Sequence, residues 1–219
     1  MIALSCKDIK KEYGTDVILN NISFAVNEGD KVALIGANGV GKTTLFKILT
    51  RQIQPDMGEY YVDKNATIGY LAQNLDLESD CDIYNETLKV FHELLAMEQK
   101  LADLEAAMAQ EWTGANQAWH EEVQTEYSTL SDLYLVRGGQ TFRAQTHRVL
   151  TGLGIPESAW VKPIAVLSGG EKTRVALAKL LLSEPSIILM DEPTNHLDLT
   201  ATEWLEEFLK SYKGTLIVI

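Results

Sequence analysis

Cysteine is scarce in this sequence, which has Cys6 and Cys81 among 219 residues. Two thiols without metal-ligand spacing make neither a disulfide framework nor a zinc site, so we interpret both as ordinary thiols. Long apolar runs are missing as well, because SIILM and TLIVI are far shorter than the roughly 20 residues of a membrane-spanning helix. Since MIALSCKDIK also lacks the apolar core of a signal peptide, the sequence predicts a soluble, cytoplasmic protein with no direct membrane insertion.

Basic residues are scarce in one stretch of the chain. Residues 76–132 contain fourteen Asp or Glu residues but only two basic ones, Lys89 and Lys100, which accounts for the net charge of −12 of the whole sequence. A run of this kind is usually a solvated helical face. Alternatively, it belongs to a protruding element that avoids non-specific phosphate contacts or meets a basic protein surface.

The rest of the composition is that of a globular protein. The apolar share is 46%, and strand-like and helix-like runs alternate, which favours the α/β class. A chain of 219 residues can bury a sizeable core and suggests one large domain, or one domain with an insertion.

The strongest motif lies in KVALIGANGVGKTTLFKIL. An apolar run, Val32 to Ile35, predicts a buried strand, and apolar residues at helical spacing follow a loop that fits G-x-x-x-x-G-K-[ST]. Backbone N–H groups of such a loop converge on phosphate oxygens, and the helix that starts near Lys42 points its positive end at the same anion. Lys42 adds a charge for the outer phosphates, and the Thr43 hydroxyl can ligate Mg²⁺. The predicted nucleotide-binding residues are Gly36, Ala37, Asn38, Gly39, Val40, Gly41, Lys42, Thr43 and Thr44. The alternative is a chance match in a glycine turn.

Two adjacent carboxylates follow a second apolar strand in SIILMDEP, Ile187 to Met190. Ligands of open parallel sheets bind at the carboxyl ends of the strands, where Asp191 is placed to hold Mg²⁺. Glu192 is placed to polarise a water for attack on the γ-phosphate. By themselves the two carboxylates could merely cap a following helix, and only their pairing with the loop favours the catalytic interpretation.

Between these motifs lies LSGGEKTRVALAKLLL. Together the three resemble the nucleotide-binding domain of an ATP-binding cassette (ABC) protein over essentially the whole chain. The resemblance implies a P-loop α/β fold with an antiparallel β subdomain and an inserted α-helical subdomain or arm, and it implies ATP and Mg²⁺ as cofactors. It also implies that the signature motif, Ser168, Gly169, Gly170 and Glu171, binds the ATP held by an opposing cassette. A plain helix cap followed by an amphipathic helix would explain the same residues locally.

Three further residues take roles from the resemblance alone. Gln73, in IGYLAQN, fits the glutamine loop that touches Mg²⁺ and the attacking water, which makes it a catalytic residue with Glu192 and Lys42. Tyr13 fits the aromatic side chain that stacks on adenine, although it could simply be a turn aromatic before a strand. Asp198 fits the loop that crosses between paired cassettes.

The family also places a switch histidine just after the strand that TLIVI predicts, which follows a helix from Leu199 to Tyr212. None of the four histidines in the sequence stands there, since three fall in the helical region and His196 precedes that helix. We therefore expect the chain to be a fragment that binds ATP with little turnover.

Two details resemble the ABC-F subfamily, whose members carry two cassettes in one chain and act on ribosomes. The first is PTNHLD after Glu192, and the second is an insertion of about 95 positions between Gln73 and Ser168. Apolar residues at steps of three and four predict two antiparallel helices, with WTGAN as the turn between them. The predicted seams are Leu94, Met97, Leu101, Leu104 and Met108, and Trp119, Val123, Tyr127, Leu130 and Tyr134.

The resulting prediction is the N-terminal cassette of a tandem ABC-F ATPase. Residues 1–74 and 166–219 form the ATPase core, and residues 75–165 form a helical subdomain whose arm spans about 85–135. The implied partners are a second cassette, the ribosome (rRNA, ribosomal protein, tRNA) and, for this chain alone, a head-to-tail copy of itself. The implied role is in translation or antibiotic resistance. The alternative is the ATP-binding subunit of an ABC membrane transporter.

Overall fold

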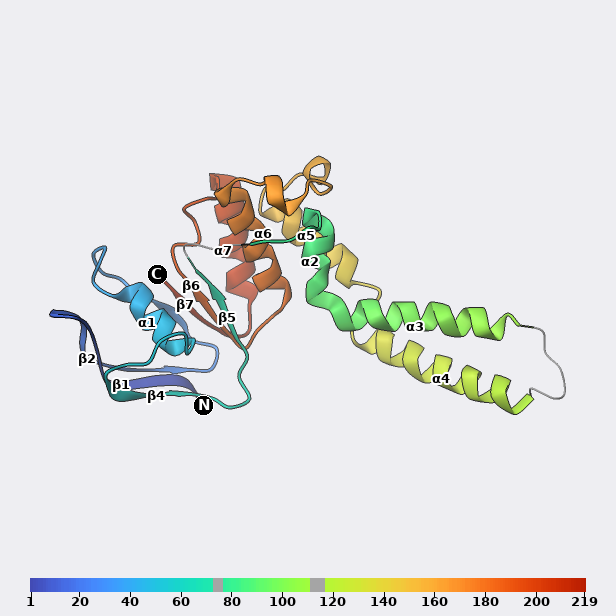
Figure 1. The fold of residues 1–219 in the computed structure, drawn as a ribbon, viewed down its shortest axis with the longest axis horizontal. Helices are drawn as coiled ribbons and strands as arrows, with labels where there is room; N and C mark the ends of the chain where they lie inside the picture. The colour runs from blue at the N-terminus through green and yellow to red at the C-terminus, as the bar shows by residue number, and fades with distance from the viewer. Residues whose placement is uncertain (73–76, 111–116) are drawn as a thin grey trace.

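The computed structural model describes residues 1–72, 77–110 and 117–219. They form two β-sheets, a group of helices packed on the sheets and a pair of helices that projects from the rest (Figure 1). This arrangement confirms the expected fold class, an α/β domain with an antiparallel sheet, a parallel sheet and inserted helices.

The antiparallel sheet contains β1 (Ile2–Tyr13), β2 (Asp16–Asn27) and β4 (Met57–Val62), in the order β2-β1-β4. One face of the sheet is apolar, and Leu4 and Ile9 on β1 are completely buried. This face packs on the helix that follows the glycine-rich loop, so that the first sheet covers that helix.

The parallel sheet has the order β3 (Lys31–Ala33), β7 (Thr215–Val218), β6 (Ile187–Met190) and β5 (Ile68–Leu71). All four residues of β6 are buried because both faces of the sheet are covered. Side chains alternate across a strand, and the first and third residues of β6 share a core with α1 (Lys42–Leu49). The second and fourth join the core formed with the helices on the opposite face.

The opposite face is covered by helices from the second half of the chain, with α6 and α7 shown in red tones in Figure 1. Leu177 and Val175 on α6 and Leu205 on α7 are almost completely buried there. The helical elements outside the projecting pair are α2 (Ile83–Leu88), η1 (Lys89–Phe91), α5 (Phe142–Gly152), η2 (Glu157–Ala159), η3 (Ile164–Val166), α6 (Gly169–Leu182) and α7 (Leu199–Ser211).

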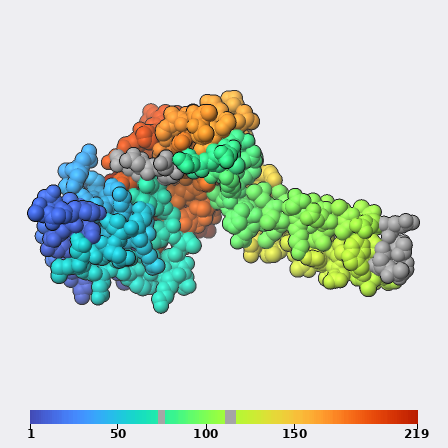
Figure 2. All heavy atoms as spheres, viewed as in Figure 1, coloured from blue at the N-terminus to red at the C-terminus, as the bar shows by residue number. Residues whose placement is uncertain are grey.

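The projecting pair consists of α3 (His92–Met108) and α4 (Gln117–Val136), and we call it the arm. The two helices lie side by side, with α3 leading away from the sheets and α4 returning, and they stand out from the body in the space-filling view (Figures 1 and 2). Lys100 pairs with Glu126 across the arm, and the Tyr127 hydroxyl donates a hydrogen bond of 2.8 Å to Glu105. The predicted turn WTGAN lies outside the described residues.

The residues of the predicted seams are buried or half-buried apart from Trp119, but few of them are fully buried. Leu94, Leu104 and Val123 are buried, whereas Trp119 remains 38% exposed and packs edge-on against the ring of His120. Trp119 lies in the first turn of α4, at the end of the arm farthest from the sheets, where fewer residues surround it. Trp119 is therefore the member of the predicted seams that the structure leaves exposed.

The predicted strand from Val32 to Ile35 needs a correction, since β3 ends at Ala33. The Leu34 N–H still donates to Val218 O at 2.8 Å, after which the backbone leaves the sheet, and Ile35 is 90% exposed. The physical reason is position: β3 lies at one side of the sheet, and the chain turns there into the glycine-rich loop.

The other predicted elements agree with the structure. The strand predicted from Ile187 to Met190 is β6, TLIVI contains β7, and the helix predicted from Leu199 to Tyr212 is α7, which ends one residue earlier. Among the described residues, no helix has both the length and the apolar character that crossing a membrane requires.

Candidate nucleotide-binding site

The glycine-rich loop connects β3 to α1 and is shaped by backbone conformations that favour glycine. Gly41 has a φ of 94° and precedes the first residue of α1. A Cβ atom on Gly41 would lie 2.8 Å from side-chain atoms of Ile18 and Leu19 on β2. The loop therefore requires glycine here, both for its left-handed turn and for the close approach of β2.

Lys42 folds back over the loop that precedes it. Its Nζ atom donates hydrogen bonds of 2.7 Å to Gly36 O and 2.9 Å to Ala37 O. The ammonium group is thus held within the curve of the loop, at the N-terminus of α1, where backbone N–H groups without a helical partner also favour an anion. Phosphate oxygens would be stronger partners for this charge than neutral carbonyls.

Asp191 and Thr43 meet at the carboxyl edge of the parallel sheet. The Thr43 hydroxyl donates a 2.5 Å hydrogen bond to Asp191 Oδ2, joining residues 148 positions apart. Asp191 is 3% exposed, and its N–H donates to Leu71 O on the neighbouring strand at 3.1 Å. A hydroxyl and a carboxylate are oxygen ligands of the type that Mg²⁺ prefers, so this pair fits a magnesium ion that also takes phosphate oxygens and water. Over residues 1–72, 77–110 and 117–219, no group of three or more His, Cys, Asp and Glu side chains forms a metal cluster.

Glu192 directly follows Asp191 in an unusual backbone conformation. Its φ is 51°, a region that non-glycine residues seldom occupy, and its N–H donates to Ile219 O at 3.1 Å. Asn195 Nδ2 donates a 2.7 Å hydrogen bond to Glu192 Oε2. We did not predict Asn195 as a site residue, because its contact with Glu192 depends on the turn between them.

Tyr13 lies at the end of β1 and is 52% exposed. Its ring has the ammonium group of Lys11 5.6 Å from the centroid. Ile18 lies across the turn on β2 and, like Tyr13, lines the cavity described below. We did not predict Ile18 as a site residue, because a single apolar residue in a strand carries no specific signal. Tyr13 and Ile18 together offer a flat, partly apolar surface of the kind that suits a purine base.

These side chains surround one cavity of about 370 Å³. It joins the loop, the start of α1, the ends of β1 and β6, and β2 at Ile18. The predicted residues that line it are Tyr13, Asn38, Gly39, Gly41, Lys42, Thr43, Thr44, Asp191 and Glu192. Gly36 and Ala37 contribute through the carbonyls that hold Lys42, and Val40 is half-exposed at the top of the loop.

A larger cavity, of about 440 Å³, lies at the opposite edge of the sheet and includes Ile187 and Thr215, the first residues of β6 and β7. Ligands of parallel sheets bind at the carboxyl ends of strands, near loops that supply N–H groups. The larger cavity lies at the amino ends of the strands, and no residue of the glycine-rich loop lines it. We therefore take the smaller cavity as the candidate nucleotide site.

The signature residues lie at the start of α6 and form a complete capping box. Ser168 Oγ accepts a hydrogen bond from the Glu171 N–H, and Glu171 Oε2 accepts one from the Ser168 N–H at 2.9 Å. A Cβ atom on Gly170 would lie 3.4 Å from the ring of His196, so the turn packs closely on PTNHLD. None of the four signature residues lines the 370 Å³ cavity.

The two remaining predicted site residues have different outcomes. Asp198 is exposed and caps α7, because its side chain accepts a 2.8 Å hydrogen bond from the Ala201 N–H. This contact explains the residue locally and leaves the predicted role at a paired cassette untested. Gln73 lies outside the described residues, so its predicted contact with Mg²⁺ and water stays a prediction.

Tyr70, on β5, lies near Asp191, and we did not predict it as a site residue. Its ring packs perpendicular to Phe46 of α1, with the ring centroids 5.9 Å apart. Burial, together with the nearby charge of Asp191, raises the pKa of Tyr70 to about 12. The phenol therefore stays neutral at physiological pH and adds no charge to the site.

The fold and this cavity define a P-loop nucleotide-binding domain. A family model described as "ABC transporter" matches residues 19–195. The chain therefore belongs to the ABC family, as its motifs predicted, and it is an ABC ATPase domain.

Two curated relatives extend the comparison. The tylosin resistance ATP-binding protein TlrC of Streptomyces fradiae is 37% identical over 216 residues, which are 99% of this chain and 39% of that protein. The energy-dependent translational throttle protein EttA of Escherichia coli (strain K12) is 34% identical over 202 residues, 92% of this chain and 35% of that protein. The chain thus spans less than half the length of these relatives.

Solved structures agree on the fold. One described as "Structure of ATP binding subunit of ABC transporter" superimposes with a TM-score of 0.65 at 20% sequence identity, covering 99% of this chain and 78% of that one. At this identity the likeness supports the fold alone.

Proposed function

We propose that this chain is the ATP-binding and ATP-hydrolysing cassette of a cytoplasmic, tandem-ABC protein of the ABC-F type that acts on the ribosome. The observation that carries the ATPase part is the single cavity that brings Lys42, the Thr43–Asp191 pair and Glu192 together. In this proposal residues 1–74 and 166–219 are the ATPase core, and residues 75–165 are the helical subdomain with the arm.

ATP binding follows from the residues around the cavity. Tyr13 stacks on the adenine, and the loop from Gly36 to Thr44 directs its N–H groups at the phosphates. Lys42 exchanges its two loop carbonyls for phosphate oxygens, a charge-assisted contact that is stronger than the one it gives up. Thr43 and Asp191 would hold Mg²⁺, which would neutralise charge on the outer phosphates.

Hydrolysis needs a base and a closed site. Glu192 Oε2 is oriented by Asn195, so the carboxylate is held in one direction while it accepts a proton from the attacking water. Gln73 supports the same water in this proposal. The signature residues of this chain lie outside the cavity. In this proposal, as the family resemblance implies, a second cassette presents its own signature turn and closes the site. The chain alone is therefore expected to bind ATP with little turnover, unless two copies pair head to tail.

The ribosome part of the proposal rests on the curated relatives and on the arm. One relative is named for a translational throttle and another for tylosin resistance, and both are similar to nearly all of this chain. The arm stands out from the ATPase core, as a contact element would (Figure 2). Its acidic character favours ribosomal protein over rRNA or tRNA as the surface that the arm meets.

The family description and the titles of the structural neighbours also name transporters, and a transporter subunit would use the same cavity chemistry. Such a subunit would bind a membrane permease and would not respond to ribosomes. Ribosome-stimulated ATP hydrolysis therefore separates the two candidates, because only the ABC-F proposal predicts it.

The test uses the full-length protein that contains this cassette. Glu192→Gln removes the base but keeps the shape and the Asn195 contact, so ATP should still bind while hydrolysis at this site falls about 100-fold or more. The variant should accumulate on ribosomes in the presence of ATP, as measured by cosedimentation.

The matched control is Glu206→Gln, which removes an exposed carboxylate from α7 and changes the net charge by the same amount. It should hydrolyse ATP and leave the ribosome like the wild type. Undiminished hydrolysis by Glu192→Gln would show that Glu192 is not the base. ATP hydrolysis by the wild type that ribosomes do not stimulate would overturn the ribosome proposal.

A further inference from the structure

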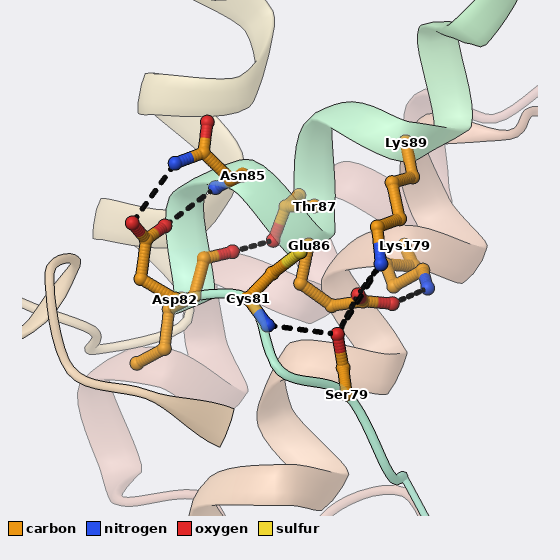
Figure 3. Close-up of polar contacts among 9 residues, drawn as sticks. Ser79, Cys81, Asp82, Asn85, Glu86, Thr87, Lys89 and Lys179 are labelled. Carbon is orange, nitrogen blue, oxygen red and sulfur yellow. Dashed lines mark hydrogen bonds and ion pairs between the residues drawn. The ribbon is translucent and has the colours of Figure 1, made fainter. Parts of the chain in front are cut away.

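A buried carboxylate lies where the arm joins the ATPase core. Glu86, on α2, is 4% exposed, which is unusual for an ionisable side chain. Figure 3 shows it surrounded by Ser79, Lys89 and Lys179, and we call these four residues the Glu86 cluster. None of them lines the nucleotide cavity, so ATP binding does not explain them.

The cluster satisfies the carboxylate completely. Glu86 Oε2 accepts hydrogen bonds from Ser79 Oγ at 2.6 Å and from Lys89 Nζ at 2.7 Å, while Glu86 Oε1 pairs with Lys179 Nζ. Burial would raise the pKa of Glu86, but the donors Lys179, Lys89 and Ser79 outweigh it and hold the pKa at about 2. The group is therefore charged at every physiological pH.

The partners of Glu86 come from three different elements. Lys179 lies on α6, the same continuous helix that begins with the signature turn. Lys89 opens η1, the turn that leads directly into arm helix α3. Ser79 lies on the segment that connects the region after β5 to α2. A single carboxylate thus ties the signature helix to the root of the arm.

Apolar packing also stiffens the root of the arm, where α2, α3 and α5 meet. Leu88, Leu94 and Phe142 form a small core of their own, and the rings of Phe91 and Phe142 lie 5.2 Å apart. This core joins α2 and α3 to α5, so a displacement of the arm is carried to α2 rather than absorbed at η1. From α2 the contact continues to α6 in two ways: Ile83 of α2 packs in the same apolar core as α6, and the Glu86–Lys179 pair adds a directed polar contact beside it.

We propose that Glu86 is a positioning residue that makes the arm and the signature helix move as one unit. The consequence, which rests on the ribosome function proposed above, is that contact at the arm changes how Ser168 meets the opposing ATP. A buried ion pair is by itself weak grounds for stability, because apolar residues of similar size can replace it. Its value here is the connection that it makes between two elements.

The experiment uses the full-length protein and two variants. Glu86→Gln removes the charge and keeps the shape. Lys179→Met removes only the link to α6 and leaves Glu86 with Lys89 and Ser79, so it is the safer variant for folding. Glu93→Gln is the control, since Glu93 pairs with Arg137 at 2.5 Å within the arm region and does not reach α6.

Two readouts follow each variant. Basal ATP hydrolysis should stay within about 2-fold of the wild type, while stimulation by added ribosomes should fall about 5-fold or more, the lower end of typical coupling between sites. Spin labels on exposed Ser128 of α4 and Ser183 at the end of α6 should report a broader distance distribution in both variants, and an unchanged one in Glu93→Gln.

Narrow distances and full stimulation in both variants would overturn the proposal. So would a parallel loss of basal and stimulated hydrolysis, which would indicate a structural role only. A wild type that ribosomes do not stimulate would refute the ribosome function instead, and the distance measurement would still decide whether Glu86 joins the arm to α6.

Discussion

Strand β6 buries all four of its residues, whereas the arm helices α3 and α4, of 17 and 20 residues, bury three between them. The carboxylates of the nucleotide site follow β6 directly, so their backbone is fixed by covered faces on both sides of the sheet. The arm is held along one thin seam and by surface ion pairs, which contribute little individually.

This difference assigns separate tasks to the two regions. The site needs side chains held to a fraction of an ångström, and a parallel sheet between two cores provides that rigidity. The arm needs reach, and two packed helices provide it with few buried residues. The direction of the arm then depends mainly on its root, where Leu88, Leu94, Phe142 and the Glu86 cluster fasten it.

Among substitutions that affect the site or the arm separately, we expect the largest effect at Lys42 in the nucleotide site. Lys42→Ala should weaken binding of a fluorescent ATP analogue about 100-fold, because charge-assisted hydrogen bonds to phosphate contribute about 3 kcal/mol. The hydrogen exchange of the arm should not change.

Lys47→Ala is the control for this prediction. Lys47 is an exposed cation in the last turn of the same helix, so its loss changes the net charge equally without touching the loop. Equal losses in the two variants would mean that overall charge, and not the cradle, holds the nucleotide.

A smaller effect, on the arm and not on the site, is expected at Leu104, which is 8% exposed. Leu104→Ala should destabilise the arm by about 2 kcal/mol and accelerate amide exchange in α3 and α4 roughly 30-fold, with ATP affinity unchanged. Leu133→Ala, at a position 40% exposed on α4, should have little effect on exchange. A fall in ATP affinity with Leu104→Ala would contradict the independence of the site from the arm seam.

The sequence predicted the elements whose patterns are local. The glycine-rich loop, β6, α7 and the two arm helices were recognisable because periodicity and glycine placement fix them within about 20 residues. The end of β3 and the exposure of Ile35 and Trp119 were not, because burial depends on which elements cover a residue in three dimensions.

The same reasoning applies to the site. Lys42, Thr43, Asp191 and Glu192 were predictable from motifs, and the structure brings all four to one cavity. Asn195 was missed because its role depends on a turn that points its amide at Glu192. The Glu86–Lys179 contact joins positions 93 residues apart, and no local pattern indicates such a pair.

The most direct test of the account is hydrogen–deuterium exchange of this chain with and without Mg-ATP. The account predicts protection of residues 36–45 and of the backbone around Asp191, weaker protection with ATP in EDTA, and no change in α3 and α4. Unchanged exchange in residues 36–45, or protection confined to the cavity at the amino ends of β6 and β7, would contradict it.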